Sequence, residues 1–198
     1  MRPTKNNPPN EKTYYSDIKY FNKDFTKETL ETGEYENCVF SNCRFSNLSF
    51  IVFINCQFIN CELSNTKLNG TVFRDVKFTK CKLMGVQFSN CNELLLSMEF
   101  EDSQLNFASF YNLKLRKTIF TKCELIETDF TGTDLSGSKF TQCDFSKTLF
   151  ENTNLSGCDF ITAFNYSIDP EKNMITKAKF SILGLRGLLT KYEIIIEQ

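Results

Sequence analysis

The 198-residue chain contains no histidine and no tryptophan, and it has only four prolines. The missing histidine removes the commonest general base and the commonest metal ligand. No apolar run approaches the roughly 20 residues that span a membrane, and the polar start, MRPTKNNPPNEK, lacks the apolar segment of a secretory signal. The net charge of −1 gives no strong field toward nucleic acid. We therefore expect no metal or cofactor, no membrane contact and no direct binding of nucleic acid.

Catalytic motifs are also missing. We find no glycine loop that would cradle a phosphate, no nucleophile elbow and no zinc signature. The aspartates and glutamates fall mostly at positions that the repeat described below directs outward. The sequence therefore predicts a protein that is not an enzyme.

The residues that are abundant are phenylalanine, with 21 copies, and cysteine, with nine. From Phe100 to Phe160, a Phe or Leu stands at every fifth position without interruption. The residue two places before each of these is mostly Ser, Thr, Ala or Cys, and the other three positions are mainly polar. A period of five fits neither a helix nor a strand. It predicts short extended segments with two inward residues each, joined by turns.

The number of sides follows from residue identity at longer spacing. Phe100, Phe120, Phe140 and Phe160 are all Phe, and Leu115, Leu135 and Leu155 are all Leu. Identity at a spacing of 20 means that four pentapeptides complete one coil. Like side chains then stack on successive coils about 4.8 Å apart, as neighbouring strands do. The sequence predicts an all-β solenoid in which each coil buries its apolar residues against the next.

These pentapeptides, among them CELIE, TDFTG, TDLSG, SKFTQ and CDFSK, resemble the motif of the pentapeptide-repeat family. The resemblance covers roughly residues 30–160. It implies a right-handed quadrilateral β-helix, which we expect to extend over residues 15–180 with a polar arm at residues 1–14.

The repeat changes register twice. Upstream, Leu30, Tyr35, Phe40, Phe45 and Phe50 share the register of the later run, and Tyr15, Tyr20 and Phe25 extend it. From Leu48 to Phe88 the apolar positions shift, so slips are expected near residues 45–53 and 88–100. Each slip predicts a bulge or short loop. It is either a tolerated insertion or a functional interruption, since interruptions of solenoids often carry function.

All nine cysteines fall at the small inward position. An odd number without an export signal indicates reduced thiols in a cytoplasmic protein. The spacing of 20 stacks Cys61 on Cys81 and Cys123 on Cys143. A metal or disulfide at these pairs is one interpretation, and packing as small hydrophobic residues is the other, which explains all nine.

The C-terminal part departs from the repeat. A turn-rich loop is expected at residues 165–174, and Ser181 is a suitable N-cap for a helix. A short strand is expected over residues 193–197. The apolar positions of the helix, which form a candidate dimer or cap surface, are Ile182, Leu185, Leu188, Leu189 and Tyr192. The segment resembles the C-termini of the quinolone-resistance (Qnr-like) branch, which implies a homodimer; the alternative is a cap folded onto the last coil.

The same resemblance implies a function. Members of that branch protect DNA gyrase or topoisomerase IV from quinolones or toxins, by proposed mimicry of duplex DNA. Residues 95–160 carry ten acidic and six basic side chains. The candidate contact residues in this half are Glu99, Glu124, Asp129, Asp144 and Asp159. The alternative is an interaction scaffold for an unknown protein, in which the basic residues Arg74, Lys77, Lys80 and Lys82 either hold an anion or form a solvated face.

Overall fold

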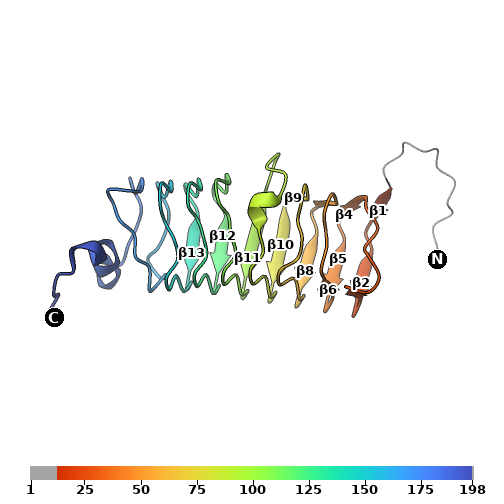
Figure 1. Ribbon diagram of the computed structural model, residues 1–198, viewed down its shortest axis with the longest axis horizontal. Coiled ribbons are helices and arrows are strands. Elements are labelled where there is room, and N and C mark those ends of the chain that lie inside the picture. Colours follow the sequence, from red (N-terminus) through yellow and green to blue (C-terminus); the bar gives the residue numbers. More distant parts are fainter. Residues whose placement is uncertain (1–12, 198) are drawn as a thin grey trace.

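The computed structural model describes residues 13–197, so residues 1–12 of the expected N-terminal arm lie outside the described part. The chain winds into a right-handed, four-sided β-helix in which all paired strands are parallel. Figure 1 shows the coils stacked into a rod, with the first strands at one end and a small helical segment at the other. The predicted fold class is confirmed.

The first face carries a four-stranded sheet of β1 (Tyr14–Ser16), β4 (Glu34–Glu36), β7 (Val52–Ile54) and β9 (Val72–Arg74). The second face carries seven strands: β2 (Lys19–Phe21), β5 (Val39–Ser41), β8 (Gln57–Ile59), β10 (Val76–Thr79), β11 (Met98–Glu101), β12 (Ile119–Thr121) and β13 (Lys139–Thr141). The third face begins with β3 (Asp24–Phe25) and β6 (Arg44–Phe45). Single bridges continue the third face and form the fourth, for example Glu124 to Asp144 and Ser109 to Asp129.

The fifth residue of each pentapeptide makes the corner. It adopts a left-handed conformation at nearly every corner, as at Asn60 (φ 53°), Asn112 (φ 59°) and Gly137 (φ 73°). Asn and Gly tolerate this conformation better than residues with larger side chains. The repeated corner turns the chain after two inward residues, which is why a period of five closes into four sides.

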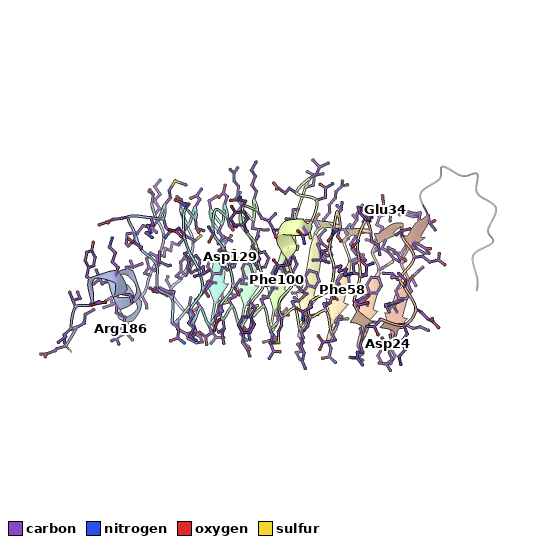
Figure 2. The ribbon with its side chains drawn as sticks, in the orientation of Figure 1. Asp24, Glu34, Phe58, Phe100, Asp129 and Arg186 are labelled. Carbon is purple, nitrogen blue, oxygen red and sulfur yellow. The ribbon has the colours of Figure 1, made fainter. Side chains whose placement is uncertain are left out.

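The interior is a stack of aromatic rings. On the second face Phe58, Phe78, Phe100, Phe120 and Phe140 are fully buried, and neighbouring ring centroids lie 5.0 to 5.3 Å apart. Figure 2 shows Phe58 and Phe100 inside the rod. Burial of this kind stabilises by about 1.5–3 kcal/mol per side chain relative to exposure, so the column is a main contributor to stability.

Both register slips are present, and each has a defined geometry. Tyr35 pairs with Phe53, 18 residues later, whereas Tyr15 pairs with Tyr35, 20 residues later. The missing two residues lie between Arg44, which bridges to Glu62, and Asn47, which bridges to Lys67.

The first slip also corrects one prediction. The sequence placed Phe50 in the inward register of Phe45, but Phe50 lies at a corner and is 72% exposed. Leu48, three residues after Phe45, fills the inward position instead and is buried.

The second slip restores the lost residues. Phe78 pairs with Phe100, 22 residues later. The two extra residues follow the short helix η1 (Phe88–Asn90), in a loop that exposes Leu94 and Leu95. The shortening and the lengthening cancel, which explains why the first and last parts of the chain share one register.

The C-terminal segment forms two short 3-10 helices, η2 (Leu183–Leu188) and η3 (Thr190–Tyr192), in place of the longer helix expected. Ser181 Oγ accepts a hydrogen bond from the Gly184 amide at 3.1 Å. The short strand expected at 193–197 does not form, because these residues pair with no strand among those described. No helix in residues 13–197 is long and apolar enough to cross a bilayer.

Candidate functional site

The interior offers no reactive group to solvent. Thiols and hydroxyls at the small inward position donate to carbonyl groups of the neighbouring coil, as in Cys158 Sγ to Leu135 O (3.0 Å) and Thr133 Oγ1 to Phe110 O (2.8 Å). Burial raises the pKa of Cys56 and of Cys158 to about 12. All nine cysteines are buried free thiols, and no cluster of three or more potential metal ligands occurs among the described residues. Candidate function therefore belongs to the outer surface.

Three of the five predicted acidic residues adjoin one another. Glu124 and Asp144 are bridged on neighbouring coils of the third face, and Asp129 lies on the fourth face of the coil that contains Glu124. Glu127 stands at the corner between them, with φ 54°. We call Glu124, Glu127, Asp129 and Asp144 the acidic corner. The sequence prediction omitted Glu127, although its place between Glu124 and Asp129 in one coil was the signal.

The carboxylates of the acidic corner are held by local hydrogen bonds. Asp129 Oδ1 accepts from the Thr131 amide at 2.9 Å, and Asp144 Oδ1 accepts from the Ser146 amide at 3.0 Å. Glu124 accepts from the Asn106 side chain at 3.1 Å. These bonds fix each carboxylate without neutralising it. The corner's one described ion pair joins Glu127 to Lys147 at 3.3 Å.

The other two predicted acidic residues lie apart, on the second face. Glu99 forms an ion pair with Lys77 at 3.0 Å, and Lys77 also contacts Glu101 at 2.8 Å. These two glutamates raise the pKa of Lys77. Asp159 sits between Lys139 and Lys179 in the bridges of the same face. This column alternates in sign, so the five predicted residues do not form one acidic face.

The predicted basic residues are also dispersed. Arg74 belongs to β9 on the first face, Lys77 to β10 on the second, and Lys82 to the bridges of the third. Lys80 occupies the corner between the second and third faces. They therefore form no common anion site.

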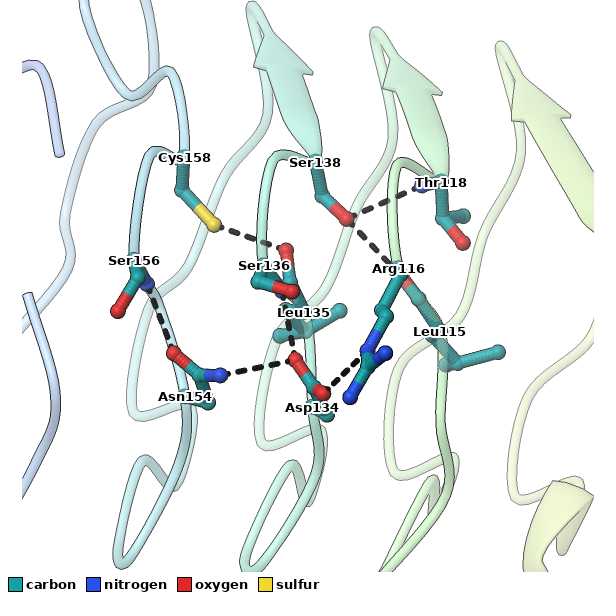
Figure 3. Close-up of polar contacts among 10 residues, drawn as sticks. All are labelled: Leu115, Arg116, Thr118, Asp134, Leu135, Ser136, Ser138, Asn154, Ser156 and Cys158. Carbon is teal, nitrogen blue, oxygen red and sulfur yellow. Dashed lines mark hydrogen bonds and ion pairs between the residues drawn. The ribbon is translucent and has the colours of Figure 1, made fainter. Parts of the chain in front are cut away.

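A polar network on the first face shows how outward side chains tie coils together (Figure 3). Asp134 accepts from Arg116 Nε at 2.6 Å, from the Ser136 amide at 3.1 Å and from Asn154 at 3.1 Å. Although partial burial acts in the opposite direction, hydrogen bonds from Arg116 and Ser136 lower the pKa of the Asp134 carboxyl. The network spans three coils and its groups are engaged with one another, so we assign it a structural role.

The C-terminal segment packs on the end of the rod. The ring of Tyr166 lies against Gly184 and Gly187, and the Ile168 amide donates to Gly187 O at 2.9 Å. Lys191 forms ion pairs with Asp169 at 2.8 Å and with Glu171 at 2.6 Å. The segment therefore caps the last coil.

The candidate dimer residues are mostly not used by this cap. Ile182 is 88% exposed, and Leu185, Leu189 and Tyr192 are also exposed, whereas Leu188 packs against the core. An open groove of about 1250 Å³ runs beside the segment and is lined in part by Phe164, Leu183 and Ile194. The cap thus leaves a large apolar surface uncovered within the described residues.

Comparison with known proteins identifies the fold. The family model of the pentapeptide repeat region matches residues 51–130 and 84–160. A structure of a trypsin-treated point variant of QnrB1, described as a plasmid-mediated fluoroquinolone resistance protein, aligns over 91% of this chain and 99% of its own, with 19% identity and a TM-score of 0.63. Full-length QnrB1 covers 92% of this chain and 100% of its own, with 20% identity and a TM-score of 0.49.

A third solved structure is HetL, a pentapeptide-repeat protein involved in regulating heterocyst differentiation in the cyanobacterium Nostoc sp. strain PCC 7120. It covers 85% of this chain and 87% of its own, at 13% identity and a TM-score of 0.40. The search of curated proteins gives no match.

Proposed function

Because this chain belongs to the pentapeptide-repeat family, we propose that it is a non-enzymatic binding protein whose partner is a type II topoisomerase. On this proposal it binds DNA gyrase or topoisomerase IV and protects the enzyme from fluoroquinolones or from a toxin. The observation that carries the proposal is the rod itself, which follows the trypsin-treated QnrB1 variant along almost the whole of both chains. Such a rod offers an elongated surface for a groove that normally holds a duplex.

The acidic corner is the part of the rod that best fits a DNA-binding groove. Duplex DNA carries about one negative charge per 1.7 Å of its axis. The corner places four carboxylates on two coils that are about 4.8 Å apart. Basic residues of the enzyme that normally contact phosphates would contact these carboxylates. Attraction of this kind steers association and weakens with salt.

The alternative is an interaction scaffold without electrostatic mimicry. The alternating signs on the second face favour it, because Lys77, Lys139 and Lys179 interrupt the acidic residues there. A scaffold partner would be bound with little dependence on salt. Salt dependence therefore separates the two functions.

We further propose that the C-terminal segment mediates a homodimer. The exposed side chains of Ile182, Leu183 and Ile195 and the groove beside them support it. Large exposed apolar patches in soluble proteins commonly mark interaction sites. Sedimentation or light scattering of the purified chain tests the dimer, and Ile182→Asp with Leu183→Asp should shift the mass to that of a monomer.

The test of the main proposal is a gyrase supercoiling assay with ciprofloxacin, with and without the purified protein, at two salt concentrations. Salt-sensitive rescue of supercoiling is expected. The variant Asp129→Asn should weaken the rescue, since it removes one charge and keeps an oxygen to accept from Thr131. Asp159→Asn is the matched control, because Asp159 makes the same kind of turn, with the Ile161 amide at 3.1 Å, on another face.

Two results would contradict the proposal. Absence of both rescue and inhibition at micromolar protein would remove gyrase as the partner. Equal losses in Asp129→Asn and Asp159→Asn would remove the acidic corner as the contact.

A further inference from the structure

One stretch of the fourth face differs from the rest of the surface in its lack of charge. Over three successive coils, at residues 65–70, 85–90 and 107–112, the one charged side chain is Lys67. The second face of the same coils carries six charged side chains, namely Asp75, Lys77, Lys80, Glu99, Glu101 and Asp102. Charge is therefore segregated away from the fourth face rather than low throughout.

Amides and aromatic rings take the place of charge there. We call the outward side chains of these three segments the amide face; its main members are Asn69, Gln87, Asn90, Phe107, Tyr111 and Asn112. Apart from Gln87, which donates to Gly85 O at 3.2 Å, these amides form no side-chain hydrogen bond among residues 13–197. Their donors and acceptors are thus free for a ligand.

Two aromatic side chains flank the last coil of this face. Phe107 is 52% exposed and Tyr111 is 49% exposed, while the intervening Ala108 and Phe110 are buried. Phe107, Ser109 and Tyr111 alternate outward along one extended segment, so the Cα atoms of the two aromatic residues are at most about 13 Å apart. Phe107 adopts this place in a left-handed conformation (φ 62°), which bulky residues rarely adopt. The Tyr111 hydroxyl has no partner among the described residues.

Size and charge restrict what this face can bind. The amide face measures roughly 15 by 13 Å from coil and residue spacing, far less than the roughly 800 Å² that each partner contributes to a standard protein interface. A single-stranded nucleic acid would stack on the rings, but it needs a basic groove. Here the neighbouring coil begins the acidic corner with Glu127 and Asp129, which repels phosphate.

We propose that the amide face binds a neutral oligosaccharide. The rings of Phe107 and Tyr111 would cover the apolar faces of sugar rings, since aromatic faces carry partial negative charge and attract polarised C–H groups. The amides of Asn69, Gln87 and Asn90 would each donate to and accept from neighbouring hydroxyls. The flat, open surface suits a short segment of an uncharged glycan chain. This binding is independent of the proposed topoisomerase contact.

The test is affinity electrophoresis of the full chain in native gels that contain glycogen, laminarin or hydroxyethyl cellulose. Retardation by at least one of these neutral polysaccharides is expected, with competition by the corresponding free hexaose. The double variant Phe107→Asn with Tyr111→Ala should weaken binding roughly tenfold, in line with the loss of an aromatic stacking platform. Phe21→Ser is the matched control, because Phe21 is an exposed aromatic residue of the second face.

A second variant guards against misfolding. Gln87→Ala with Asn90→Ala leaves both aromatic residues in place and should also weaken retardation. Three outcomes overturn the proposal: no retardation by any of the three polymers, retardation that both double variants leave unchanged, or retardation by dextran sulfate or poly(dT) in place of the neutral polymers.

Discussion

The ring of Phe50 lies over Gly70 on the next coil, so closely that a Cβ atom built on Gly70 would come within 2.9 Å of Phe50 Cδ1. Both residues occupy corners with positive φ, 62° and 65° respectively. A bulky residue at one corner therefore requires glycine at the corresponding corner of the next coil. This pair lies at the first register slip, where the ladder is shortened by two residues.

Gly70→Ala should destabilise the protein for two reasons: the strain of a left-handed Ala, about 1–2 kcal/mol, and the contact with Phe50. Gly157→Ala is the matched control, because Gly157 has φ 69° and its nearest atom to an added Cβ is 3.9 Å away. Denaturant titration should give a larger loss for Gly70→Ala. The difference should vanish in a Phe50→Asn background, and its persistence there would contradict the clash.

Phe130 tests the aromatic interior. It is fully buried and stacks on Phe110 at 5.0 Å and on Phe150 at 5.7 Å. Phe130→Ala should lower the free energy of unfolding by about 3–5 kcal/mol. Phe21→Ala, at an exposed position, should change it by less than about 0.5 kcal/mol. A loss near zero for Phe130→Ala would contradict its inward assignment.

Tyr166 tests the packing of the cap. Its hydroxyl is buried without a hydrogen-bond partner among the described residues, and a Cβ on Gly184 would collide with it. Tyr166→Phe removes the unpaired group and should leave stability unchanged or raise it by about 1 kcal/mol. Gly184→Ala alone should loosen the segment, seen as faster hydrogen exchange in residues 183–192, and Tyr166→Phe should partly restore protection. A clear loss of stability in Tyr166→Phe would indicate a partner for the hydroxyl.

Acid should release the same segment. Hydrogen bonds from Lys191 lower the pKa of Asp169 and of Glu171. A carboxyl whose pKa is lower in the folded state stabilises it above the unfolded pKa, and this contribution is lost as the pH falls through the folded value. Hydrogen exchange of residues 183–192 should therefore accelerate below about pH 4. Lys191→Met should remove this dependence, whereas Lys179→Met should keep it.

Alkaline conditions should destabilise the interior through its thiols. Burial raises the pKa of Cys56 and Cys158 to about 12, above the ordinary value of 9.0. Between these values the unfolded chain releases thiol protons that the folded chain retains, so the free energy of unfolding falls as the pH rises. The melting temperature should drop between about pH 9 and 11, and replacing Cys56 and Cys158 by Ala should make the drop smaller. An unchanged slope would contradict buried, protonated thiols.

The sequence alone determined which side chains face inward. A period of five with identity at 20 fixes two buried positions per pentapeptide, because only a four-sided coil stacks like residues on like. The all-β solenoid and the nine buried cysteines follow from this pattern, and so does the stacking of Cys61 on Cys81. Even the two slips were visible in the spacing of Phe and Leu.

Only the tertiary structure decided which outward residues meet. The 18-residue coil shifts the alignment by two, so Cys43 stacks on Cys61 and Phe50 turns outward, contrary to the prediction from its register. Corners join Glu124 to Asp129 across two faces and separate both from Asp159, which no repeat position reveals. The exposed positions obey no packing constraint, so their pattern in sequence is weak, and their neighbours depend on how many residues each coil contains.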